Sequence, residues 1–120
     1  LALVAREDKL EANPDVYKRF VEATALGWQE AMKDPEAAVD ALLEIFPETA
    51  HSKENLLQSA KFSFASVCPG GAGDAIGVTD AETWETMYGV MTSAMNLPDT
   101  KPVTDYYTLD YLPETPVTCP

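Results

Sequence analysis

The stretch NPDVYKRFVEATALGWQEAMKDPEAAVDALLE, residues Asn13–Glu44, predicts two helices in succession. Each helix is opened by an Asx-Pro pair, Asn13-Pro14 for the first and Asp34-Pro35 for the second. A short Asn or Asp side chain can accept hydrogen bonds from the free N–H groups of a first helical turn. Proline suits the first helical position because no N–H is needed there. The stretch therefore indicates a pair of capped helices.

The first helix, expected over Asp15–Lys33, carries one apolar face, and the second is expected over Glu36–Ile45. Gly27 lies within that face beside Trp28. An interior glycine costs about 1 kcal/mol relative to alanine, so we expect Gly27 to permit close packing. The face recurs at three- and four-residue spacing and comprises Val16, Tyr17, Phe20, Val21, Thr24, Trp28, Ala31 and Met32.

Outside this pair, the chain predicts one strand and two further helices. The apolar run Leu1–Ala5 is typical of a strand buried in a parallel sheet. Ser52 is expected to cap a third helix that runs to about Val67. A T-x-x-E capping box, Thr79 with Glu82, opens a fourth.

Length and charge limit the classes of function. The chain has 120 residues, 46% hydrophobic and 23% charged, which suits one globular domain. Its net charge is −12 and its eight Lys and Arg residues are scattered, which argues against a nucleic-acid partner. No apolar run approaches the ~18 residues of a membrane span.

The sequence motifs predict no catalytic residue, no metal site and no cofactor. The glycine-rich segment Gly70–Gly77 lacks the lysine of a phosphate loop and follows a helix, so we interpret it as a flexible linker. His51 is the single histidine, and no ligand partner lies at zinc-site spacing, so we place it in a surface turn. No nucleophile–base pair is evident, and Met87, Met91 and Met95 indicate core packing.

The proline-rich segment 99–120 is expected to form an extended tail. Within it, Tyr106 and Tyr107 are candidate ligand-binding residues, because aromatic rings commonly line clefts for flat ligands. The alternative, which we favour, is that they fasten the tail to the helices. Cys68 and Cys119 either form a disulfide that ties this tail down or remain free thiols, and we favour the disulfide.

Several motifs in order resemble the NMT1/THI5-like family of substrate-binding proteins of ABC transporters. They are a strand (Leu1–Ala5), a charged turn (Arg6–Glu11), "NPD" (Asn13–Asp15), Gly27-Trp28, "DPE" (Asp34–Glu36), "AVDALL" (Ala38–Leu43), Asp80–Trp84 and the closing Tyr107–Pro113. The resemblance implies an α/β class, as a partial lobe of a periplasmic-binding-protein type 2 fold. This stretch would be mostly helical with one N-terminal strand, and residues 1–120 would form a single C-terminal segment of that lobe.

The resemblance also implies a function: non-enzymatic capture of a small organic solute, such as a thiamine pyrimidine, a sulfonate or nitrate. The implied partners are the solute, an ABC permease and an N-terminal portion of the same protein, and the implied location is periplasmic or extracellular, at the transporter. We expect an unpaired strand edge and exposed apolar faces to promote self-association. Two alternatives stay open: a thiamine-pyrimidine biosynthesis enzyme of the same family, and a small helical interaction domain.

Overall fold

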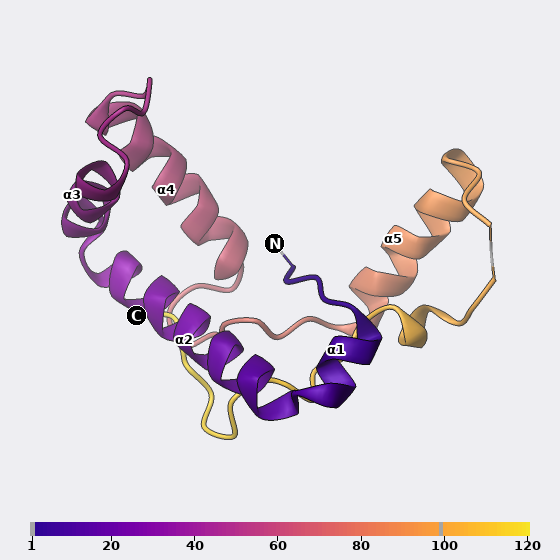
Figure 1. Ribbon diagram of the computed structural model, residues 1–120. Helices are drawn as coiled ribbons and strands as arrows, with labels where there is room; N and C mark the ends of the chain where they lie inside the picture. The colour runs from indigo at the N-terminus through magenta and orange to yellow at the C-terminus, as the bar shows by residue number, and fades with distance from the viewer. Residues whose placement is uncertain (1, 99) are drawn as a thin grey trace. The chain divides into compact units, whose positions relative to one another are not determined.

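The computed structural model describes residues 2–98 and 100–120 (Figure 1). Their mostly helical character confirms that part of the prediction. The chain forms two compact units, one of residues 1–77 with 112–120 and the other of residues 78–111. The elements in chain order are α1 (Glu7–Ala12), α2 (Pro14–Lys33), α3 (Pro35–Ile45), α4 (Lys53–Val67), α5 (Ala81–Ala94) and the 3₁₀ turn η1 (Val103–Asp105).

Side-chain caps start two helices of the first unit as predicted. The Asp34 carboxylate accepts from the Ala37 N–H at 3.0 Å at the start of α3. The Ser52 hydroxyl accepts from the Asn55 N–H at 3.2 Å at the start of α4. Asn13 makes no side-chain cap bond, so Pro14 alone carries the start signal of α2.

The cap of α5 differs from the prediction. Asp80 rather than Thr79 is the N-cap residue, and its carboxylate accepts from both the N–H and the hydroxyl of Thr83, each at 2.7 Å. A carboxylate has two oxygens and can accept both bonds at once, whereas the threonine hydroxyl has a single oxygen. The capping-box pattern of Thr79 with Glu82 therefore lies one residue too early.

The N-terminal strand predicted over Leu1–Ala5 is wrong for its described part. Residues 2–5 have no regular secondary structure, and the side chain of Val4 is 93% exposed, while residue 1 lies outside the described residues. A strand needs a neighbour for its main-chain hydrogen bonds, and the described chain holds just one isolated bridge, which lies elsewhere. The charged turn expected at Arg6–Glu11 is largely the short helix α1.

In the first unit, α1 packs on α2, α2 on α3, and α3 on α4 (Figure 1). Trp28 of α2 meets Phe64 of α4 edge to face, with ring centroids 6.1 Å apart. The core therefore lies where the second half of α2 meets the end of α4 and two non-helical segments. Its buried members are Ala25, Ile76, Val117 and Cys119, with Trp28, Val67 and Cys68 packed against them.

In the first half of the predicted α2 face, Tyr17 and Val21 are half-buried and the other two residues are exposed. Val16 is 52% exposed and Phe20 57% exposed, whereas the α2 residues that belong to or pack on the core, Ala25 and Trp28, lie in its second half. Gly27 does not permit close packing, since an added Cβ there would meet no atom within 4 Å. The close-packing prediction for Gly27 is therefore wrong.

The glycine-rich segment is not a free linker. Ala75 forms an antiparallel bridge with Thr118, and Ile76 is buried in the core. Gly71 and Gly73 both have φ of +92°, a region that residues with a Cβ rarely adopt. The glycines therefore shape a loop that docks on the C-terminal segment.

The second unit consists of α5, η1 and their connections. None of its described residues is buried, because one helix and a short turn cannot enclose both faces of the helix. Met87 is 42% exposed and Met95 64% exposed, so the prediction of core packing is wrong for these two, while Met91 is half-buried.

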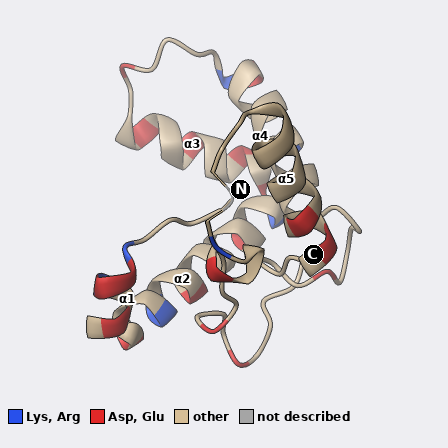
Figure 2. Cartoon of the chain, turned by 90° about the vertical axis from the view of Figure 1, so that its right-hand side faces the viewer, with Lys and Arg blue, Asp and Glu red and all other residues tan. Residues whose placement is uncertain are grey.

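Acidic positions occur on most of the helices and basic positions are few (Figure 2), in keeping with the net charge of −12. Among the described residues, no helix combines the length and hydropathy that crossing a membrane requires.

Candidate functional site

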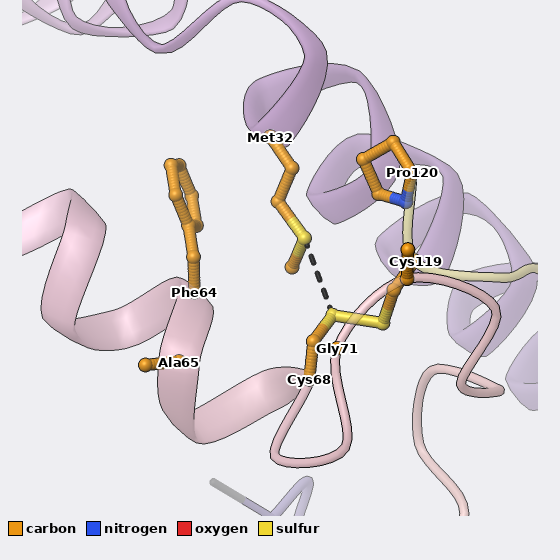
Figure 3. A pocket seen from close by; sticks show the side chains of 8 residues that line it. Met32, Phe64, Ala65, Cys68, Gly71, Cys119 and Pro120 are labelled. Atoms are coloured by element: carbon orange, nitrogen blue, oxygen red, sulfur yellow. Dashed lines mark hydrogen bonds between the residues drawn. A yellow bond between two sulfur atoms is a disulfide. The ribbon is translucent and has the colours of Figure 1, made fainter.

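The chemically most distinctive place in the first unit is a cluster of three sulfur atoms (Figure 3). Cys68, the C-cap residue of α4, forms a disulfide with Cys119 of the C-terminal segment, with Cα atoms 6.1 Å apart. The Met32 Sδ, from the last turn of α2, lies 3.3 Å from the Cys68 Sγ. A disulfide sulfur has no proton to donate, so this is a direct sulfur–sulfur contact. Three separate segments of the chain thus bring their sulfurs together.

Hydrogen bonds hold the C-terminal segment in place independently of the disulfide. The Gln29 side-chain amide of α2 donates to the Thr118 carbonyl at 2.7 Å. The position of Cys119 is therefore fixed from two sides, by α2 and by the glycine-rich loop. Three main-chain bonds make the loop contact: Gly73 N–H to Cys119 C=O (2.9 Å), Cys119 N–H to Asp74 C=O (2.8 Å) and Ile76 N–H to Val117 C=O (2.8 Å).

A hollow of about 280 Å³ opens beside the three sulfurs. Its other lining residues carry no charged side chain and include Phe64, Ala65 and Pro120 (Figure 3). Such a lining can surround an apolar group or a soft ion, but its side chains offer no carboxylate or imidazole to a hard cation.

The two candidate ligand-binding tyrosines pack on α5 in the second unit. The Tyr107 ring stacks on Trp84, with centroids 4.7 Å apart and planes 9° from parallel. The Tyr106 ring lies against Tyr88 at 5.5 Å and remains 48% exposed. The Tyr88 hydroxyl donates to the Lys101 carbonyl at 2.9 Å, which fastens the same segment. These contacts correspond to the packing alternative, and Tyr106 keeps an exposed surface.

At the start of α5, hydrogen bonds change the pKa of an acidic side chain. The N–H and hydroxyl of Thr83 both donate to the Asp80 carboxylate, which lowers the pKa of Asp80 from its ordinary value of 3.8. Hydrogen bonds to the ionised form account for this direction. Asp80 acts here as a helix cap.

His51 lies exposed in the turn before α4, as predicted. Within residues 2–98 and 100–120, no three or more His, Cys, Asp or Glu side chains gather in a way that could hold a metal ion. The sulfur cluster contains two such side chains, because its third member, Met32, is a thioether.

The sequence does not single out Met32 of the cluster or Gln29, which holds the C-terminal segment. The periodicity places Met32 on the apolar face of α2, one turn after Trp28, and gives no indication that it meets a cysteine. Gln29 belongs to no motif and to no predicted apolar face. The partners of Met32 and Gln29 lie 36 and 89 residues away in sequence, beyond the reach of any local periodicity.

The comparisons with known proteins give one positive finding. Residues 1–38 match the family model described as NMT1/THI5 like. The match covers 38 of the 120 residues, spans α1, α2 and the start of α3, and includes the Asn13–Asp15 and Gly27-Trp28 motifs. The motifs at Asp80–Trp84 and Tyr107–Pro113 lie outside it. No curated protein and no solved structure shows a significant match to the chain.

Proposed function

We propose that this chain is part of the solute-binding component of an ABC importer, and that it belongs to a lobe of a periplasmic-binding-protein type 2 fold. In this proposal the protein captures a small organic molecule, of the thiamine-pyrimidine, sulfonate or nitrate class, and delivers it to a membrane permease without chemical change. The observation that carries the proposal is the NMT1/THI5-like match over residues 1–38.

The disulfide between Cys68 and Cys119 supports the transport reading over the enzymatic one. Disulfides persist in oxidising compartments such as the periplasm or the extracellular space and are rare in the cytosol. A solute-binding protein works in such a compartment. A thiamine-pyrimidine biosynthesis enzyme of the same family is the second candidate, because the family match supports it equally.

The exposed surface of Tyr106 is the proposed ligand contact in the second unit. Tyr107 is less suited, because the Trp84 ring already covers one of its faces. A flat ligand would stack on Tyr106, and the remainder of the binding cleft would come from the proposed N-terminal portion of the same protein.

Thermal denaturation of the protein expressed from its complete gene tests the proposal. The panel comprises pyrimidines, sulfonates, nitrate and flavins, because a tight ligand raises the melting temperature by mass action. We expect one class to raise it, with the ligand recovered unchanged after incubation. Turnover of the ligand would favour the enzyme, and no shift with any class would contradict solute capture.

A variant pair locates the contact. Tyr106→Ala should weaken binding of the class that gives the shift, whereas Phe62→Ala, at a 76% exposed position on α4, should leave it unchanged. Equal binding by both variants would remove Tyr106 from the site and leave the transport proposal standing.

A further inference from the structure

We propose that, after reduction of the Cys68–Cys119 disulfide, the two thiolates and the Met32 thioether form a binding site for one soft monovalent metal ion, with Cu(I) as the preferred ion. The inference starts from the convergence of the three sulfurs from α2, α4 and the C-terminal segment. It is independent of the proposed transport function.

The first argument is the ligand set. Thiolate and thioether sulfurs select Cu(I) among biological metals, whereas Mg²⁺ and Ca²⁺ take oxygen ligands. The side chains that line the adjoining hollow include no carboxylate and no imidazole. Zn²⁺ usually takes four protein ligands in a closed site, and this cluster offers three sulfurs. The chemistry of the cluster therefore favours a soft ion with low coordination number.

The second argument is that the sulfurs stay near one another once the covalent bond is broken. Cys119 is tied to the glycine-rich loop by two main-chain hydrogen bonds of 2.8–2.9 Å. Gln29, less than one turn before Met32 on α2, holds the adjacent Thr118 carbonyl. Cys68 remains the cap residue of α4, its N–H bonded to the Phe64 carbonyl at 2.9 Å. Reduction therefore removes one bond from a junction that has several others.

The third argument is the surroundings of the sulfurs. Cys119 is 5% exposed, and Phe64 and Pro120 border the hollow beside the sulfurs (Figure 3). In such a place the sulfur ligands, rather than water, would compensate a soft monovalent ion for its lost hydration. Cys68 is the more exposed of the two cysteines and is the point where a reductant can attack.

The chemical steps balance with a dithiol as the reductant. One thiolate of the dithiol attacks the Cys68 Sγ, the bond to the Cys119 Sγ breaks, and the second dithiol sulfur resolves the mixed disulfide. The dithiol is oxidised to its own disulfide, and Cys68 and Cys119 are released as thiols. Cu(I) then displaces two protons and binds both thiolates, and Met32 adds a thioether lone pair without any change in oxidation state.

The test is an anaerobic Cu(I) titration of the reduced chain against a chromophoric Cu(I) chelator. We expect one Cu(I) per chain, with ultraviolet copper–thiolate absorption, and weak competition by Zn²⁺. X-ray absorption at the copper edge should give three sulfur neighbours. Absence of binding to the reduced chain, or preferential binding of Zn²⁺, would overturn the proposal.

Matched variants isolate the role of the thioether. Met32→Leu preserves most of the volume but removes the sulfur, and should weaken Cu(I) binding by about tenfold or more with a sulfur count of two. Met87→Leu, in α5 and outside the cluster, should bind like the unaltered chain. Circular dichroism of both variants checks the fold, and equal affinity with a folded Met32→Leu would refute the three-sulfur site.

Discussion

Breaking the Cys68–Cys119 bond should strongly destabilise this chain. The bond joins residues separated by 51 positions, and closure of a loop of that length restricts the unfolded chain by about 4 kcal/mol. Domains of this size have total stabilities of about 5–15 kcal/mol. Reduction should therefore remove a large share of the stability and still leave a folded population.

The cleanest measurement compares the oxidised and reduced forms of one protein in urea. With a denaturant slope near 2 kcal/mol per molar, we expect the midpoint to fall by about 2 M on reduction. A Trp84→Phe background leaves Trp28, beside the core of the first unit, as the fluorescent reporter. A Cys68→Ala/Cys119→Ala variant should behave like the reduced form.

A midpoint change below about 0.5 M would refute this reasoning. It would mean that the loop is already confined in the unfolded chain. Alternatively, the hydrogen bonds from Gln29 and the glycine-rich loop would not hold the C-terminal segment in the native state. Amide hydrogen exchange at Cys119 and Ile76 separates these explanations, because both N–H groups donate within that junction.

Three further predictions concern local structure. Gly27→Ala should stabilise the chain by about 1 kcal/mol in urea unfolding, because the added Cβ meets open space, whereas Gly77→Ala should destabilise it, because φ there is +89°. Ser52→Ala should cost about 1 kcal/mol through loss of the α4 cap, with Ser52→Asn restoring most of it. The pKa of Asp80 is lowered in the folded state, so the ionised Asp80 cap stabilises the protein above pH 3.8, and this stabilisation is lost as the pH falls through the lowered pKa. An asparagine caps a helix without titrating. On acidification, the thermal unfolding midpoint of Asp80→Asn should therefore fall less than that of the unaltered protein.

Helices α2 to α5 follow from the sequence because their signals are local. The Asp34-Pro35 start and the Ser52 cap act within four residues of themselves, and the observed bounds of α3 and α4 agree with them closely. The capping of α5 was predicted one residue early because Thr79 and Asp80 are both acceptable caps by composition. The backbone conformation before the helix determines which of these two residues caps it.

The strand prediction failed for a different reason. An apolar run such as the one at the N-terminus indicates that its side chains favour burial. Whether it forms a strand depends on a neighbouring strand, which the run itself does not contain. The same reasoning applies to Val16 and Phe20. Their spacing correctly predicts a helix, but in the described chain both side chains remain exposed.

By itself, the sequence determined where helices α2 to α5 lie, which residues begin α3 and α4, and that the surface is acidic. The tertiary structure decided between a disulfide and free thiols by bringing the Cα atoms of Cys68 and Cys119 to 6.1 Å. It also docked the glycine-rich loop on the C-terminal segment and placed Met32 against Cys68. These contacts join residues between 36 and 51 positions apart, and no helical or strand period extends that far, so their geometry exists only once the chain has folded.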